Sequence, residues 1–587
     1  MDIFSILSLI GGLALFLYGM ELMGDSLKKL AGGKLESILA KLTSTRFKGF
    51  LLGLIVTAII QSSSATTVML VGFVNSGIMK LGQTISIIMG ANIGTTITAW
   101  LLSTADIGDS ATFILKLFKP DSFTPILAGI GLLMTMMAKS DKNKNIGSIF
   151  IGFALLMFGM DAMSGAVDGL RDNESFINIL TMFSNNPIMG IIVGTLFTAV
   201  LQSSSASVGV LQALSLTCVI PYSTAIPVIL GQNIGTTITP IISSISGNTE
   251  SRRVAVSCLY IKMIGVVVVC GIFYVMNHFI GFEFMSYRAT AINIAMIHTL
   301  FNIVSTVILV PFCSLIEKLA VKTIRGKEKE HKADIFDMLD ERFLSIPAFA
   351  VEKCKDLVGN MAMLSIESFT EATKLIKNYN KDKFAEIEEL ETTVDKYEDK
   401  TSTYLVKIAA TQMSANDSKK VTELLHCIGD IERISDHALS IAKAGREISD
   451  KSLDFSDNAK KDLSIITAAV TEILEITATA LINDDAELAK RVEPLEQVVD
   501  RLKRKIKNGH ISRLRQGECT MELGFILSDL LTCFERISDH CSNIAACLIE
   551  ISHDSMETHE YLNTLKSGGI EEFGKMYEEY KAKYYIA

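Results

Sequence analysis

The stretch QSSSA at residues 61–65 decides how this sequence is interpreted, because it places polar residues inside a long apolar run. The same five letters return at residues 202–206, which is 141 positions later. GANIGTTIT from Gly90 and GQNIGTTIT from Gly231 form a second pair at the same offset. GLALFLYGMELMG and GFALLMFGMDAMS, which precede the two QSSS motifs, form a third pair at an offset of 140. Three motifs in register indicate an internal duplication.

Apolar segments surround these motifs, and they are long enough to enter or cross a bilayer. They lie near residues 3–23, 49–78, 84–103, 124–138, 146–165, 190–219, 225–245, 254–276 and 291–312. The first 320 of the 587 residues hold 18 basic and 15 acidic side chains, and the other 267 hold 37 and 49. The sequence therefore predicts a multi-pass membrane half followed by an acidic soluble half. This composition excludes a disordered chain and a nucleic-acid binder, which would need a basic face.

The ten cysteines are scattered and form no CxxC pair. We therefore expect free thiols in the bilayer or in reducing cytosol, and neither a disulfide framework nor a zinc site.

The loops predict that the two copies have opposite orientations in the membrane. Residues 24–48 carry six basic side chains, whereas the equivalent loop at 166–190 carries only Arg171 among three acidic residues. By the positive-inside rule the first loop is cytoplasmic and the second lies outside. An inverted-topology repeat of this kind is typical of alternating-access transporters.

The predicted loop orientations are consistent with one another if residues 49–78 and 190–219 are re-entrant hairpins. Seven helices then cross the cytoplasmic membrane, the N-terminus lies outside, and the soluble half is cytoplasmic. The alternative is that each segment is one long tilted span. A polar motif in the middle of each run favours the hairpins, because a break there frees backbone groups that need partners.

The polar motifs predict a site for an anion and small cations. Hydroxyls and half-helix N-termini suit an anion, and freed carbonyls suit a hard cation. No charged residue lies between Gly49 and Met79 or between Gly190 and Thr239. We therefore expect neutral dipoles to hold the anion and co-bound cations to offset its charge, rather than a proton relay. The alternative is that small polar residues only pack helices together.

Two QSSS motifs, each followed about 30 residues later by NIGTT, resemble the type II sodium–phosphate cotransporters over roughly residues 1–315. The resemblance implies phosphate as substrate and sodium as the co-transported ion. It also implies that the QSSS hairpins line the site, with the NIGTT residues beside them. The substrate- and sodium-binding residues predicted in this way are Gln61, Ser62, Ser63, Ser64, Thr66, Asn92, Thr95, Thr96, Gln202, Ser203, Ser204, Ser205, Asn233, Thr236 and Thr237.

The sequence shows no catalytic triad, nucleotide-binding glycine loop or ATPase signature, so we expect a carrier and not an enzyme. One alternative is a sodium-coupled transporter of another anion, such as a dicarboxylate. Another is a membrane phosphate sensor that transports nothing.

The C-terminal half contains a second duplication. ERISDH at 432–437 returns at 535–540, and LETTVD at 390–395 resembles LEQVVD at 495–500. Each motif places two carboxylates four residues apart, on one face of a helix. Paired carboxylates from adjacent helices can chelate a divalent metal. The predicted ligands are Glu391, Asp395, Glu432, Asp436, Glu496, Asp500, Glu535 and Asp539. The alternative is a solvated acidic face with arginine partners.

The ERISDH duplication resembles the PhoU family over roughly 345–555. The resemblance implies two tandem three-helix bundles with metal-bearing faces and a link to the control of phosphate transport. The bundles could form a homodimer. We therefore expect an all-α chain made of a transport domain at 1–315, a linker at 316–340, a PhoU-like domain at 341–555 and a helical tail at 556–587. The repeats are expected at about 1–138 and 146–312.

Overall fold

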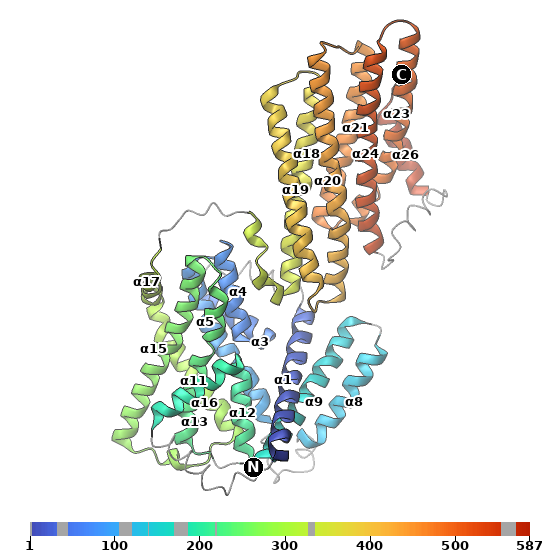
Figure 1. Cartoon of the computed structure of the whole chain (residues 1–587). Coiled ribbons are helices and arrows are strands. Elements are labelled where there is room, and N and C mark those ends of the chain that lie inside the picture. The colour runs from blue at the N-terminus through green and yellow to red at the C-terminus, as the bar shows by residue number, and fades with distance from the viewer. Residues whose placement is uncertain are drawn as a thin grey trace. The chain divides into compact units, whose positions relative to one another are not determined.

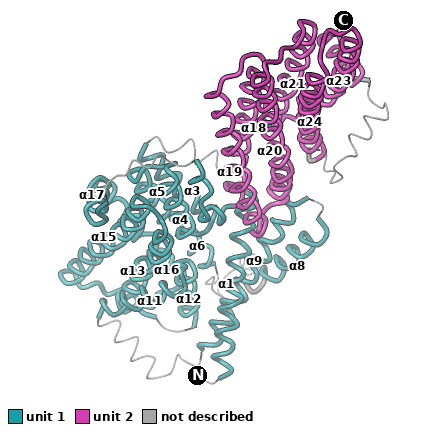
Figure 2. Tube along the Cα trace, turned by 45° about the horizontal axis from the view of Figure 1, so that its top comes forward, with its two compact units in different colours: residues 1–346 teal, residues 347–587 magenta. Residues whose placement is uncertain are grey.

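The computed structural model contains two compact units, residues Met1–Ile346 and Pro347–Ala587 (Figure 2). It describes residues 3–31, 45–104, 120–138, 140–168, 186–217, 220–326, 335–552 and 571–586. Every named element in these ranges is an α- or 3-10 helix, which confirms the predicted all-α class. Most residues of the two charge-asymmetric loops lie outside the described residues.

The described helices of the first copy of the repeat lie in the first unit (Figure 1). They are α1 (Ile3–Ala31), α3 (Arg46–Ile60), α4 (Ser63–Asn75), α5 (Leu81–Gly94), α6 (Thr96–Ser103) and α8 (Pro120–Met137). The second copy repeats this order as α9 (Asp141–Val167), α11 (Pro187–Leu201), α12 (Ser204–Thr217), α13 (Tyr222–Gly235), α14 (Ile238–Ser244) and α15 (Thr249–Ile280). After the repeats come α16 (Ala291–Leu309) and α17 (Cys313–Thr323), and short 3-10 helices at Ile335–Met338 and Glu341–Ser345.

The duplication is also visible in the way the helices pack. Helix α3 packs along α5, and α11 packs along α13 in the same way. A Cβ atom at Gly53 would overlap the carbonyl of Ile87, and one at Gly194 would overlap the carbonyl of Val228. These two glycines are 141 residues apart, so both copies use the same close backbone approach.

In the part of the first unit that the structure describes, six helices are long and apolar enough to cross a membrane. They are Ile3–Leu30, Leu81–Ser103, Asp141–Val167, Tyr222–Ser244, Thr249–Ile280 and Ala291–Thr323. The seventh predicted crossing, near 124–138, is a shorter apolar helix at Phe123–Met137. The seventh long apolar helix is instead Asp457–Asn483, which lies in the second unit. Its apolar residues pack against other helices of that unit, because a helix inside a bundle needs the same composition as a membrane span.

The described residues of the second unit form two three-helix bundles and an added helix. The first bundle holds α18 (Pro347–Leu375), α19 (Lys381–Ala409) and α20 (Ala415–Asp450). The second holds α21 (Asp457–Asn483), α23 (Val492–Arg515) and α24 (Met521–Ser552), with the short α22 (Ala486–Ala489) between its first two helices. Helices α20 and α24, which carry the two ERISDH motifs, pack against each other. The tail forms α26 (Glu571–Lys583), which packs on α23.

Candidate functional site

The polar motifs break each apolar run into two helices. Helix α3 ends at Gln61 in a left-handed conformation with φ of 60°, and α11 ends at Gln202 with φ of 55°. The next helix begins at once, because the hydroxyl of Ser62 accepts from the amide of Ala65 and that of Ser203 accepts from the amide of Ala206. Neither segment is therefore one continuous span. At about 1.5 Å per residue, each 15-residue first limb is too short for a bilayer core of about 30 Å.

The limbs of each pair are held together by one buried hydroxyl contact. In the first copy the Thr57 hydroxyl donates to Thr66, with the two oxygens 3.0 Å apart. In the second copy Thr198 donates to Ser207, at 2.7 Å. Thr66, which was predicted to bind substrate or sodium, thus braces its hairpin and does not line the cavity described next.

The two breaks meet at one cavity of about 180 Å³. Seven of the predicted residues line it, namely Gln61, Ser62, Ser63, Ser64, Ser203, Ser204 and Ser205. The first residues of α4 and α12, Ser63 and Ser204, are both in this set, so the positive ends of two helix dipoles lie at the cavity. Backbone amides and hydroxyls at two helix N-termini can bind an anion.

Helix α1 adds charged side chains that were not among the binding residues predicted from the sequence. Glu21, Asp25 and Lys28 line the same cavity, and the Lys28 ammonium lies 2.9 Å from an Asp25 carboxylate oxygen. The hairpins themselves are neutral as predicted, but the cavity is not. Carboxylate oxygens suit hard cations such as sodium. Glu21 could have been found from the sequence, because it lies in the repeated GMELMG segment and the second copy has Asp161 at the same place.

The other predicted residues do not line the cavity. The hydroxyls of Thr95 and Thr96 donate to carbonyls of α5, and those of Thr236 and Thr237 donate to carbonyls of α13, at 2.7 to 3.1 Å. They lie where α5 passes into α6 and α13 into α14. Asn92 and Asn233 are buried, and Gln202 is the left-handed residue of its break. The NIGTT segment still reaches the first motif, because Thr98 donates to the Gln61 side-chain oxygen at 2.6 Å.

The segment at residues 340–343, which precedes the second unit in the sequence, packs against α4. Phe343 packs against Phe73 with ring centroids 5.3 Å apart, and Asp340 accepts from the side-chain amide of Asn75 at 2.8 Å. Arg342 donates to the Ser243 carbonyl at the end of α14. One helix therefore begins at the QSSS cavity and ends at these contacts.

The predicted metal ligands of the second unit gather on an acidic face in each bundle. Burial raises the pKa values of Glu391, Asp395 and Glu432, and the Asp436 carboxylate on α20 raises all three further. In the second bundle burial raises the pKa of Asp539, and the carboxylate of Glu535 raises it further. Within the described ranges, however, no three His, Cys, Asp or Glu side chains are grouped closely enough to hold a metal ion.

Arginine and lysine partners are present on the same faces. Arg433 lies 3.3 Å from Asp436, Arg536 lies 3.5 Å from Asp539, and Lys503 pairs with Glu535. The histidines of the two ERISDH motifs stack on each other, with ring centroids 5.7 Å apart. This arrangement fits the solvated-face alternative as well as a metal site.

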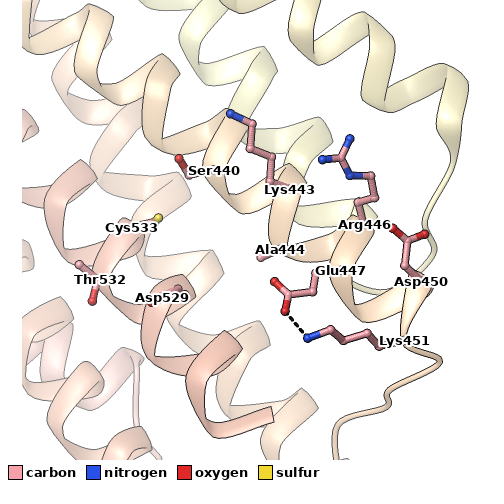
Figure 3. A pocket seen from close by; sticks show the side chains of 10 residues that line it. All are labelled: Ser440, Lys443, Ala444, Arg446, Glu447, Asp450, Lys451, Asp529, Thr532 and Cys533. Carbon is pink, nitrogen blue, oxygen red and sulfur yellow. Dashed lines mark hydrogen bonds and ion pairs between the residues drawn. The ribbon is translucent and has the colours of Figure 1, made fainter. Parts of the chain in front are cut away.

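A larger cavity of about 600 Å³ lies between α20 and α24 of the second unit (Figure 3). Its lining includes the cations Lys443, Arg446 and Lys451 and three acidic residues. Lys451 pairs with Glu447 and Glu522, at 2.7 and 2.9 Å. The opposite charges largely balance, so the lining favours neither an anionic nor a cationic ligand.

Comparisons with known proteins agree with this division of the chain. The Na+/Pi-cotransporter family model matches residues 15–165 and 169–316, and the PhoU domain model matches 358–445 and 463–548. YjbB of Salmonella typhimurium, named as a candidate inorganic phosphate export protein, is 22% identical over 95% of this chain and 100% of its own length.

Two further relatives match one part of the chain each. Sodium-dependent phosphate transport protein 2A of Rattus norvegicus is 34% identical over 18% of this chain and 17% of its own. PhoU homolog 1 of Thermotoga maritima, a phosphate-specific transport system accessory protein, is 24% identical over 36% of this chain and 91% of its own. The chain therefore belongs to the Na+/Pi-cotransporter family and carries a PhoU domain behind its transport domain.

Proposed function

We propose that this protein moves inorganic phosphate across the cytoplasmic membrane together with sodium, by alternating access. The observation that carries the proposal is the single cavity lined by both QSSS breaks. Two helix N-termini and the six serines that line this cavity can hold the phosphate oxygens. Glu21 and Asp25 supply oxygens for sodium, and the inverted repeat supplies two halves that can rock about the site. The balance of the sodium and phosphate gradients sets the direction of net transport.

The test is flux of labelled phosphate in proteoliposomes containing the purified protein. Phosphate should move only when sodium is present, and unlabelled phosphate should compete better than a dicarboxylate. Stronger competition by the dicarboxylate would favour the other-anion alternative. Phosphate binding without any flux would instead favour a sensor.

We further propose that the PhoU domain lies on the cytoplasmic side and regulates transport through the anchor on α4, defined as the contacts of Asp340, Arg342 and Phe343. Replacing Phe343 with alanine removes the ring that packs on Phe73. We expect transport rates to change about fivefold or more, in the same direction as truncation after Ile346, because coupling between sites typically amounts to 1–3 kcal/mol.

The matched control is Phe312→Ala, which removes an exposed ring elsewhere in the same unit. It should leave the rate unchanged. A Phe343→Ala protein with normal transport, beside a truncated protein with altered transport, would show that regulation does not pass through this anchor.

We also propose that a divalent metal binds the acidic faces of the PhoU domain. The raised carboxyl pKa values mean that the folded protein holds more protons than the unfolded chain. The contribution of these four carboxyls to stability should therefore be greatest at acidic pH and decrease as the pH rises through their folded pKa values. Added manganese should reverse that decrease by neutralising the same charges, and should raise the melting temperature at neutral pH.

The measurement is melting of the purified protein against pH with and without manganese, combined with elemental analysis. Changing Asp436 and Asp539 together to alanine should remove the metal effect. If the wild-type protein contains no metal and its melting does not respond to manganese, the faces are only solvated surface.

A further inference from the structure

A lysine side chain is buried in the transport unit without a carboxylate partner. Lys262 lies on α15, within the membrane-crossing helix Thr249–Ile280, and is 6% exposed. Its ammonium donates to the side-chain oxygen of Asn233 at 3.0 Å, and no described residue forms an ion pair with it. Asn233 belongs to the second NIGTT motif and is 1% exposed.

An unpaired ammonium in this position is costly. Moving a charged group from water into a low-dielectric interior costs several kcal/mol unless it gains an opposite charge. Ionisable residues inside membrane segments therefore usually mark the path of an ion or substrate. Next to Lys262, within reach of its charge, is His298 of α16, which is 2% exposed and has a ring Nδ1 with no hydrogen-bond partner in the described chain.

Lys262 is connected to both copies of the repeat. The contact with Asn233 connects it to the second copy. One turn before Lys262, the thiol of Cys258 lies within reach of the Thr67 side chain of α4. The Thr67 hydroxyl in turn donates to the Ser63 carbonyl at 2.8 Å, and Ser63 lines the QSSS cavity. Cys258, Thr67 and Ser63 therefore connect the region of the buried charge with the cavity.

We propose that the Lys262 ammonium is a built-in counter-cation for the transported oxyanion. This inference rests on the proposed function, because it assigns part of the charge balance of the phosphate site to the protein itself. The transported sodium ions then need not offset the whole anionic charge. When phosphate is absent, the side-chain oxygen of Asn233 holds the ammonium in place.

The test compares two variants that lose one positive charge. Lys262→Met keeps the length of the side chain without its charge, and Lys322→Met removes the charge of an exposed lysine on α17. Labelled phosphate flux is measured in proteoliposomes at saturating sodium. We expect Lys262→Met to raise the phosphate KM about tenfold or more, since losing one partner of a buried charge interaction typically costs that much or more. Lys322→Met should leave KM unchanged.

A second variant separates a charge effect from a packing effect. Asn233→Asp is nearly isosteric, keeps Lys262 in place and pairs the ammonium with a carboxylate. If Lys262 only holds α13 and α15 together, this ion pair should preserve both the melting temperature and the phosphate KM. If Lys262 balances the anion, the melting temperature should be kept or raised while KM increases as in Lys262→Met.

The outcomes distinguish this inference from the proposed function. If the wild-type protein transports phosphate normally, and Lys262→Met and Asn233→Asp both have KM values within about twofold of wild type, the role of Lys262 is overturned. The proposed function is then unaffected. A wild-type protein without phosphate flux would overturn the proposed function and this inference with it. If Lys262→Met does not fold, Asn233→Asp still decides the question, because it keeps the lysine.

Discussion

Replacing Ser63 or Ser204 with tryptophan is expected to reduce phosphate transport to about 1% of wild type or less, while the protein still inserts into the membrane. Both serines are nearly buried, at 8% and 6% exposure, and both line the cavity of about 180 Å³. An indole at either position fills the space needed by the anion and displaces the helix N-terminus. Displacements of about 1 Å in a site can cost about a hundredfold in rate.

The control for this pair is Ser286→Trp, which places the same indole at an exposed serine of the transport unit. It should transport normally. Flux is measured in proteoliposomes and insertion by the yield of monodisperse protein in detergent. Normal flux in both cavity variants would remove these serines from the transport site.

Replacing Glu21 with glutamine is expected to weaken the sodium dependence of phosphate binding about tenfold or more. The change keeps the size of the side chain but removes a carboxylate from the cavity lining. Under the proposed coupling, sodium and phosphate each raise the affinity of the protein for the other, and by linkage they do so by the same factor. In the wild type, calorimetry should show much weaker phosphate binding without sodium. In Glu21→Gln the difference between the two conditions should shrink.

The repeat supplies a matched control. Asp161 is the residue of the second copy that corresponds to Glu21, but it is not part of the cavity lining. Asp161→Asn should therefore keep the sodium effect of the wild type. Equal effects of the two substitutions would mean that Glu21 acts only through long-range charge.

Local patterns in the sequence predicted the features that depend on neighbouring residues. The polar interruption of an apolar run is local, so the breaks at 61 and 202 were predicted. Duplicated motifs predict duplicated structure, and residues of both QSSS motifs line one cavity. The ERISDH duplication, through its resemblance to the PhoU family, likewise implied two bundles in the second unit.

Features that depend on packing between distant helices were not predicted. The expectation of a neutral site came from the hairpins alone, whereas Glu21 and Lys262 reach the region from α1 and α15. The NIGTT threonines were expected beside the substrate, but their hydroxyls donate to carbonyls of α5 and α13. The helix at Phe123–Met137 is shorter than a typical span of about 20 residues, and its predicted crossing rests on composition rather than length.

The most direct test of sodium-coupled phosphate transport is accumulation of labelled phosphate in proteoliposomes under an imposed sodium gradient. With sodium outside and choline inside, phosphate should rise inside above its external concentration, and a sodium ionophore should collapse that accumulation. Reversing the sodium gradient should drive phosphate out of preloaded vesicles. Phosphate that only equilibrates across the membrane, at the same rate with choline as with sodium, would contradict the account.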